Sequence, residues 1–490
     1  MATQEFHIRL KEAMQRKNIK QIDVLRAAEV QNIKLGKSHM SQYVSGKSIP
    51  RDNILNFLAS YLDVSPQWLK NGQSEPLESE QTGEIPMRKF TKSSKLDNVL
   101  YDVRGPVVDE AARMEEAGTH ILKLNIGNPA PFGFRAPDEV IYDMARQLTD
   151  CEGYSNSKGQ FSARKAIMQY MQEKNVPNVS MENIFTGNGV SELINLSLQA
   201  LLDTGDEVLI PSPDYPLWTA CVTLSGGKPV HYICDEQSEW NPDVNDMRSK
   251  ITPKTKAIVI INPNNPTGAL YPKEVLQQIV DLAREHQLMI FADEIYDRLV
   301  LNGQEHISIA SLAPDLFCVT FSGLSKSHMV AGFRVGWMVI SGNTRLGRDY
   351  IEGLNMLSNM RLCSNVPAQS IVQTALGGYQ SVKNYIVPGG RVYEQAEFIT
   401  KALNDIPGIS AVKPKAGFYI FPKIDTKKFN ITDDEQFTFD LLREKKILLI
   451  AGKGFSWHQP DHFRIVYLPR IEVLDEATQK LRDFLQYYRQ

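Results

Sequence analysis

Residues 322–337 carry the side chains most able to do chemistry, with Lys326 in the stretch SGLSK and Arg334 eight positions later in GFRVGW. A lysine that forms a Schiff base needs small neighbours, because a flat cofactor must lie against the backbone beside it. The arginine adds a permanently charged, planar fork that suits a phosphate. A lysine among small residues is otherwise a solvated loop residue, so this interpretation depends on two segments upstream.

Two short apolar runs upstream each lead into a polar side chain. Residues 288–291 (LMIF) precede Asp293, and residues 258–261 (IVII) precede a loop that holds Asn265. Such runs predict buried parallel strands, whose C-terminal ends are where open α/β sheets hold ligands. Asp293 is suited to keep a pyridine nitrogen protonated, and Asn265 to donate a hydrogen bond to a phenolate oxygen. Each segment alone could be an ordinary strand–loop junction, but the three together predict a cofactor site.

Residues 95–490 resemble the fold-type I aminotransferases, which depend on pyridoxal phosphate (PLP). Besides the segments above, the resemblance rests on the stretches LNIGNP at 124–129, TGNGVSE at 186–192 and PDYPLW at 213–218. It implies an α/β fold in which a large domain, at about 140–385, holds a mostly parallel seven-stranded sheet. A smaller α+β domain is expected from about 95–139 and 386–490.

The resemblance also implies roles for individual residues. Lys326 is expected to hold PLP and to move the proton on the substrate Cα, Asp293 to keep the ring nitrogen protonated, and Tyr215 to stack on the pyridine ring. The other expected cofactor contacts come from Gly189, Val190, Ser191, Asn265, Tyr296, Ser325 and Arg334. Many relatives have serine where this chain has Gly323. Ser322 or Ser325 is therefore expected to make part of the hydrogen bonds of that serine.

Two further positions resemble the substrate contacts of the family, and Asn265 is expected to join them. Gly127 has no side chain, which lets an amino acid approach the backbone closely. Arg464 enters an apolar strand at 462–466 (HFRIV) and is expected to bind the substrate α-carboxylate through two parallel hydrogen bonds. The alternative for Arg464 is an internal ion pair, because a buried charge needs a partner.

Tyr154 begins a segment, residues 154–159, that resembles the Tyr-x4-Gly motif of the family. In the family this tyrosine reaches across a dimer interface to the phosphate bound by the neighbouring chain. The resemblance therefore implies a homodimer with shared active sites, in which a monomer is inactive.

The stretches at 124–134, 211–220 and 361–369 are most similar to the bacterial glutamate–pyruvate (alanine) aminotransferases. The predicted reaction converts L-alanine and 2-oxoglutarate into pyruvate and L-glutamate, with ping-pong kinetics. Such an enzyme must also accommodate the γ-carboxylate of glutamate, and the sequence identifies no counter-charge for it. Aspartate or aromatic amino acids remain alternative substrates.

Residues 1–72 form a separate, helical region. The stretches SQYVSGKSIPR at 41–51 and VSPQWLKNG at 64–72 resemble parts of phage-repressor-type helix-turn-helix domains, which implies DNA binding. Residues 1–75 hold 11 Lys or Arg and 7 Asp or Glu, whereas the whole chain has a net charge of −3. This basic balance suits phosphate contacts. The candidates for contact with a DNA groove are Lys37, Ser38, Gln42 and Tyr43.

Two alternatives remain open for the N-terminal region and for the whole chain. The region could be a module for protein contacts that has lost DNA binding, and the chain could be a transcription regulator whose PLP domain senses an amino acid. The sequence contains every residue that turnover is expected to need, and this favours an enzyme over a sensor. These residues are Lys326, Asp293, Asn265, Arg334 and Arg464.

The remaining features predict a cytoplasmic protein with no metal and no membrane segment. Residues 73–94 are polar and acidic at their start and predict a flexible linker. No apolar stretch approaches the ~20 residues that cross a membrane, and residues 1–5 lack the features of a signal peptide. Five cysteines form no CxxC pair, so reduced thiols are expected. His458 and His462 are four apart, but Pro460 between them and the lack of a third ligand disfavour a metal site.

Overall fold

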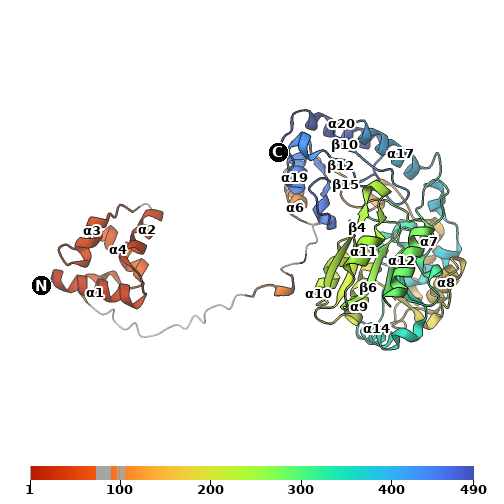
Figure 1. The fold of residues 1–490 in the computed structure, drawn as a ribbon, viewed down its shortest axis with the longest axis horizontal. Helices are drawn as coiled ribbons and strands as arrows, with labels where there is room; N and C mark the ends of the chain where they lie inside the picture. Colours follow the sequence, from red (N-terminus) through yellow and green to blue (C-terminus); the bar gives the residue numbers. More distant parts are fainter. Residues whose placement is uncertain (1, 32, 73–89, 97–98, 100–104) are drawn as a thin grey trace. The chain divides into compact units, whose positions relative to one another are not determined.

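The computed structural model describes residues 2–31, 33–72, 90–96, 99 and 105–490 (Figure 1). The chain divides into two compact units, residues 1–92 and 93–490. Most of the linker predicted at 73–94 lies outside the described residues. Among the described residues, no helix combines the length and the apolar character needed to cross a membrane.

The N-terminal unit consists of short helices around one small core. Its helices are α1 (Ala2–Arg16), α2 (Gln21–Val30), α3 (Lys37–Val44), α4 (Asp52–Leu62) and α5 (Pro66–Asn71). Phe6 and Leu10, one helical turn apart on α1, are fully buried together with Val24, Met40 and Leu58. Each fully buried side chain of this kind contributes about 1.5–3 kcal/mol to stability. The unit therefore has a core of its own.

One predicted surface residue of this unit faces inward. Tyr43, which we expected to contact a DNA groove, is only 6% exposed and packs in the core of the unit. Met40 lies three residues before it on α3, so the two side chains share the helix face that is turned to the core. Lys37, Ser38 and Gln42 are exposed.

The C-terminal unit is built around an eight-stranded sheet in the order β2-β9-β8-β7-β6-β3-β4-β5. The strands are β2 (Ile184–Gly187), β3 (Glu207–Ser212), β4 (Lys228–Asp235), β5 (Asn241–Pro242), β6 (Thr255–Ile261), β7 (Met289–Asp293), β8 (Phe317–Gly323) and β9 (Gly336–Gly342). Strands β4, β3, β6, β7 and β8 are parallel to one another. At the edges, β9 is antiparallel to both β8 and β2, and β5 is antiparallel to β4. The prediction of a mostly parallel sheet is confirmed, but seven strands was wrong. The eighth strand, β5, has two residues, too few for a hydrophobic pattern to reveal.

Helices cover the two faces of this sheet. Along β6, Ile258 and Ile260 enter one core, whereas Val259 and Ile261 enter another, because successive side chains of a strand point to opposite faces. The first core also takes the apolar sides of α8 (Phe161–Glu173) and α12 (Lys273–Glu285), and the second those of α9 (Val190–Leu201), α10 (Leu217–Leu224) and α14 (Arg348–Met360). The sheet is thus buried on both sides, as its continuous apolar strands require. The remaining helices of this part are α7 (Asp138–Gln147), α11 (Val244–Lys250), α13 (Leu324–Ser327), α15 (Val366–Ser370) and α16 (Val372–Gly377).

A third core joins the two ends of this unit. Its strands are short and form three small sheets: β1 (Leu122–Lys123) with β13 (Ile447–Leu448), β10 (Ile409–Ser410) with β12 (Lys423–Ile424), and β11 (Tyr419–Ile420) with β15 (Phe463–Val466) and β14 (Ile450–Ala451). The helices of this core are α17 (Arg391–Asn404), α18 (Thr426–Phe429), α19 (Asp434–Lys445) and α20 (Ile471–Tyr487), and α6 (Pro106–Glu116) packs beside α19 in a small core of its own. Figure 1 shows α17 and α20 beside these strands. Leu124 near the start of the unit and Ile465 near its end pack in the same core.

The core of the N-terminal unit predicts that residues 1–72 fold when they are produced alone. Circular dichroism should show helix that is lost cooperatively on heating. Leu58→Ala should destabilise the fragment by about 2–5 kcal/mol because it leaves a cavity in the core. Ile8→Ala removes a side chain that is 57% exposed and should change stability by less than about 0.5 kcal/mol. A gradual, non-cooperative loss of helix would contradict an independent core.

Candidate active site

A cavity of about 780 Å³ lies at the carboxyl ends of the central parallel strands. Ile261, the last residue of β6, and Asp293, the last of β7, both line the cavity and are register partners. Most of the predicted site residues line it too, namely Gly127, Val190, Ser191, Tyr215, Asn265, Tyr296, Ser325, Lys326, Arg334 and Arg464. The sheet therefore gathers side chains that are far apart in the sequence.

Lys326 projects from the short helix α13, which follows β8 directly. Its Nζ donates a hydrogen bond to the carbonyl oxygen of Gly127 over 2.6 Å. Just before this helix, a Cβ on Gly323 would lie 2.7 Å from the carbonyl oxygen of Val335. A serine at position 323 would force that backbone to shift, which accounts for the glycine. The neighbouring Ser322 is buried, and its Oγ donates to the carbonyl oxygen of Glu294 over 3.5 Å.

Asp293 presents a buried carboxylate to the cavity and is 3% exposed. Its Oδ2 accepts a hydrogen bond from Nε1 of Trp218 over 3.1 Å, and its Oδ1 accepts one from the amide of Ile295 over 3.3 Å. Burial raises the pKa of Asp293 to about 6, with a further contribution from the charge on Glu294, while the two hydrogen bonds oppose the rise. The carboxylate is therefore mostly ionised at neutral pH and can accept a hydrogen bond from an N–H or O–H group of a ligand.

Arg464 and Asn265 both line the cavity and are bonded to each other. Nη1 of Arg464 donates to Oδ1 of Asn265 over 2.9 Å, and Nη2 donates to the carbonyl oxygen of Asn125. The guanidinium carbon stands 4.6 Å from the ring centre of Tyr419 and 4.5 Å from that of Phe455. Two aromatic faces and two acceptors thus hold a buried cation in one orientation. Because Oδ1 of Asn265 accepts, its amide nitrogen remains the atom that can donate to a ligand.

The N-terminus of α9 meets Arg334 at the cavity. The helix begins after Gly189, which has a φ of 83° and provides no side-chain cap. Nη2 of Arg334 donates to the carbonyl oxygen of Asn188 over 3.2 Å, and a Cβ on Gly189 would collide with that guanidinium group. Backbone N–H groups at the start of a helix and an adjacent arginine both attract an anion. Gly189 itself does not line the cavity, whereas Val190 and Ser191 do.

Two aromatic residues of the site were missed from the sequence. Tyr419 lines the cavity, and its Oη lies 2.7 Å from Oη of Tyr296. A Cβ on Gly127 would collide with the same hydroxyl group, so the glycine makes room for Tyr419. Trp218 was recognised only as part of a motif, and its hydrogen bond to Asp293 was not predicted. No local pattern marks Tyr419, because β11 has only two residues.

Tyr154 does not reach the cavity of its own chain. Its side chain is 82% exposed, and it is absent from the cavity lining. The segment that carries it is nevertheless fixed to the rest of the unit, since Nη2 of Arg361 donates to the carbonyl oxygen of Ser157 over 3.1 Å.

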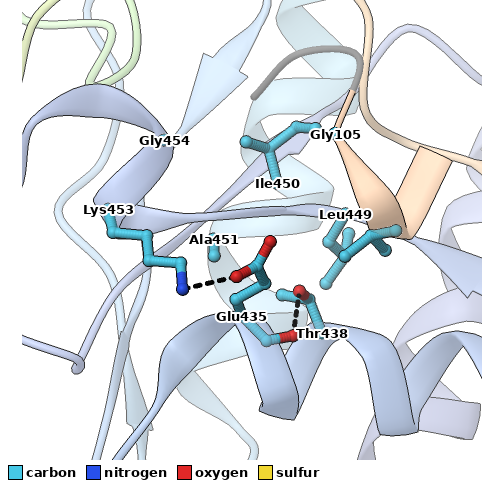
Figure 2. A pocket seen from close by; sticks show the side chains of 9 residues that line it. Gly105, Glu435, Thr438, Leu449, Ile450, Ala451, Lys453 and Gly454 are labelled. Carbon is cyan, nitrogen blue, oxygen red and sulfur yellow. Dashed lines mark hydrogen bonds and ion pairs between the residues drawn. The ribbon is translucent and has the colours of Figure 1, made fainter. Parts of the chain in front are cut away.

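A second cavity near α19 is too small for a substrate (Figure 2). Its volume is about 20 Å³, which is room for about one water molecule. Figure 2 shows Lys453 paired with the carboxylate of Glu435 and Thr438 bonded to the backbone of the same residue, at distances of 2.5 Å and 2.9 Å. These polar groups are occupied with one another.

Residues 119–481 match the protein family described as aminotransferase class I and II. The chain belongs to this family. The glutamate-pyruvate aminotransferase AlaA of Escherichia coli (strain K12) is 59% identical over 404 residues, which cover 82% of this chain and 100% of the relative. The alanine aminotransferase of Mycobacterium tuberculosis (strain H37Rv) is 54% identical over 404 residues, covering 82% of this chain and 94% of the relative.

Solved structures agree with this assignment. An aminotransferase from Escherichia coli is 58% identical and has a TM-score of 0.81, with 82% of this chain and 100% of that chain covered. The alanine aminotransferase from Pyrococcus furiosus is 38% identical and has a TM-score of 0.77, with 81% of this chain and 100% of that chain covered. The PLP-dependent transferase fold of type I is therefore confirmed for the aminotransferase unit.

Aminotransferases of this class use PLP, and the cavity of this aminotransferase fits that cofactor. A pyridine nitrogen needs an ionisable carboxylate, which Asp293 provides at the end of β7. A phosphate needs N–H donors and a cation, which the start of α9 and Arg334 provide. A carbonyl carbon needs a primary amine within reach, and Lys326 lines the same cavity.

The raised pKa of Asp293 predicts a pH dependence of stability in the PLP-free aminotransferase. The folded-state pKa of about 6 exceeds the ordinary value of 3.8, so the folded protein binds more protons between these values. Stability should therefore fall as pH rises from about 4 to about 6, by about 3 kcal/mol for two pKa units. Asp293→Asn should remove this fall, which thermal unfolding across that pH range would measure. Asp475→Asn on α20 alters an exposed carboxylate and serves as the control; an equal effect of both variants would contradict the assignment.

Proposed function

We propose that this aminotransferase converts L-alanine and 2-oxoglutarate into pyruvate and L-glutamate. The observation that carries the proposal is the identity of 54–59% to glutamate-pyruvate and alanine aminotransferases over nearly their whole length. The cavity supports it, because Lys326, Asp293, Asn265 and Arg464 all line one space. An aspartate aminotransferase of Bacillus subtilis is 30% identical, so alanine is the favoured substrate over aspartate.

Each of these residues has a distinct task in the proposed reaction. When bound, PLP accepts the electrons of the carbanion that forms at the substrate Cα. Nζ of Lys326 would take up and return the proton at the substrate Cα, and the carboxylate of Asp293 would keep the ring nitrogen protonated. The guanidinium group of Arg464 binds the substrate α-carboxylate through two parallel hydrogen bonds. Because Arg464 is held by Asn265 and two aromatic rings, it is oriented before substrate arrives.

The remaining cofactor contacts follow from the same cavity. Tyr215 would stack on the pyridine ring, and the amide of Asn265 and the hydroxyl group of Tyr296 would contact its phenolate oxygen. Val190, Ser191 and Arg334 would hold the phosphate at the start of α9, together with Gly189 just before the helix and Ser325 in the cavity lining. The backbone of Gly127 would contact the substrate, because Gly127 lines the cavity and its carbonyl oxygen lies beside Nζ of Lys326.

We further propose that the enzyme is a homodimer in which Tyr154 completes the active site of the neighbouring chain. Tyr154 is 82% exposed, which suits a residue that acts on another subunit. Large apolar side chains are exposed close by in the sequence and at the end of α14, among them Phe161, Met360 and Leu362. Arg361 ties the end of α14 to the segment of Tyr154. A shared interface would bury these side chains.

The proposed reaction predicts that both half-reactions can be followed in the absorbance of the PLP-loaded enzyme. L-Alanine or L-glutamate should convert the bound cofactor to its amino form, and pyruvate or 2-oxoglutarate should reverse the change. Lys326→Ala should lose both conversions while its thermal midpoint stays close to that of the wild type, because the side chain is only partly buried. An absorbance shift without conversion would instead identify an amino-acid sensor, and conversion by L-aspartate alone would identify a different substrate class.

A second candidate function, DNA binding by residues 1–72, is favoured by the charge around α3. Lys34, Lys37, Lys47 and Arg51 are exposed and form no ion pair with any residue that the structure describes. Elsewhere in the unit, Lys17 is paired with Asp63 over 3.4 Å. We propose that α2 and α3 form a helix-turn-helix and that α3, with exposed Lys37, Ser38 and Gln42, lies against DNA. Dimerisation would bring two such units to one DNA molecule.

DNA binding can be tested by fluorescence anisotropy of the full-length protein with a labelled duplex at several salt concentrations. Lys37→Gln and Lys47→Gln should each weaken binding and should lower the slope of log affinity against log salt by about 0.9, the value for one lost phosphate contact. Lys17→Gln removes the same charge from a paired lysine and should have little effect. No binding at low salt, or equal effects of all three variants, would favour a module for protein contacts.

A further inference from the structure

A buried group of charges lies directly behind the active site. Nζ of Lys174, the residue that directly follows α8, contacts Oε2 of Glu294 over 2.5 Å and Oδ2 of Asp297 over 2.8 Å. The side chains of the three residues are 12%, 2% and 3% exposed. Buried charges are costly to desolvate, so such a cluster persists only where its partners satisfy it.

Neighbouring polar groups complete the cluster. Oγ of Ser308 donates to Oε1 of Glu294 over 2.7 Å, and the hydroxyl group of Tyr170 donates to Asp297. Glu294, Asp297 and His306 also have the spacing of a metal site, with ligand atoms within 4.8 Å of one another. Lys174 already supplies the cation between the two carboxylates. Burial and the nearby Lys174 lower the pKa of His306. A second cation, Arg298, lies over the ring of Tyr170, with its guanidinium carbon 4.4 Å from the ring centre, and its charge also lowers the pKa of Asp297.

The cluster is connected to the two loops that carry cofactor-binding residues. Glu294 follows Asp293 in the chain, and its amide donates to the carbonyl oxygen of Phe321 over 2.8 Å. A ring nitrogen of His306 lies 3.0 Å from the carbonyl oxygen of Asn262, the first residue of the loop that holds Asn265. A change in the position or charge of Glu294 can therefore affect Asp293, to which it is joined by one peptide bond.

The charges make this connection specific. Glu294 places a negative charge beside Asp293 and disfavours ionisation of the Asp293 carboxyl group. Its charge is opposed by Lys174, which remains protonated because Asp297 and Glu294 raise its pKa despite burial. The other groups around Asp293 are the donors Trp218 from α10 and Ile295 from its own loop. Lys326 from α13 and Tyr296 line the same cavity.

We propose that Lys174 is a positioning residue of this aminotransferase that keeps the Asp293 carboxylate ionised by neutralising Glu294. The proposal rests on the role given to Asp293 under the proposed function, as the partner of the cofactor ring nitrogen. Lys174 touches neither substrate nor cofactor, and its effect passes through Glu294. The chemistry that it protects is the hydrogen bond between Asp293 and a protonated pyridine nitrogen.

The experiment measures the affinity of the PLP-free protein for PLP by fluorescence titration at pH 6 and pH 8.5. Lys174→Met should weaken binding about fivefold at pH 6, as expected for a rise of one pKa unit in a carboxyl group with a pKa of about 6. At pH 8.5 the loss should nearly disappear, because Asp293 ionises in both proteins. Lys174→Arg keeps the charge and should restore wild-type affinity. Wild-type affinity of Lys174→Met at pH 6 would overturn the proposal.

Two double variants separate this electrostatic role from a structural one. Lys174→Met/Glu294→Gln and Lys174→Met/Asp297→Asn have the same net charge, but only the first removes the charge that borders Asp293. The first should bind PLP at pH 6 within about twofold of the wild type, and the second should stay weak. Equal recovery in the two, or none in either, would show that Lys174 acts only through packing and overturn the proposal.

Two controls distinguish an effect on PLP affinity from a loss of folding and from a failure of the proposed function. Thermal unfolding reports the stability of every variant, so a loss of affinity at unchanged midpoint supports the proposal. If Lys174→Met does not fold, the single variants Glu294→Gln and Asp297→Asn take its place, and only the former should tighten PLP binding at pH 6. PLP affinity does not depend on turnover. A wild-type protein that binds PLP but converts no alanine would refute the proposed function while leaving the Lys174 pattern measurable.

Discussion

Ile261 at the end of β6 pairs with Asp293 at the end of β7, and Asp293 pairs in turn with Phe321 of β8, shortly before Lys326. This register places the carboxyl ends of three parallel strands at one edge of the sheet. Each strand is buried on both faces, so a slip of one residue would exchange the side chains that fill the two cores. The hydrophobic pattern of the strands therefore also fixes the spacing of the side chains that are proposed to be catalytic.

The active site depends equally on charges that are held out of water. Asp293 and Arg464 are each 3% exposed. Trp218 donates a hydrogen bond to Asp293, and Asn265 and two aromatic rings contact the guanidinium group of Arg464. Behind them, Lys174 and its two carboxylates satisfy one another. The charges that are proposed to bind a ligand, on Asp293 and Arg464, are thus distinct from the charges of the Lys174 cluster, which pair with one another.

The two units of the chain follow different designs. The aminotransferase unit gathers its functional residues from along more than three hundred positions, from Gly127 to Arg464. The N-terminal unit uses local helices, and the exposed basic residues proposed to contact DNA, Lys34, Lys37, Lys47 and Arg51, lie within about twenty residues around α3. Of the residues that the sequence predicts to contact DNA, Lys37, Ser38 and Gln42 are exposed, whereas Tyr43 shares the inward face of α3 with Met40.

The sequence by itself determined which residues could bind a cofactor. Lys326 lies among small residues, and Asp293 and Asn265 each follow an apolar run. These local signals do not depend on the rest of the fold. It could not reveal β5, which is only two residues long, or Tyr419, which meets Tyr296 from 123 positions away. Lys174 and Glu294 are likewise separated by 120 positions. Only the tertiary structure decided these partners, because contacts between distant segments depend on how helices and strands pack and not on any pattern within them.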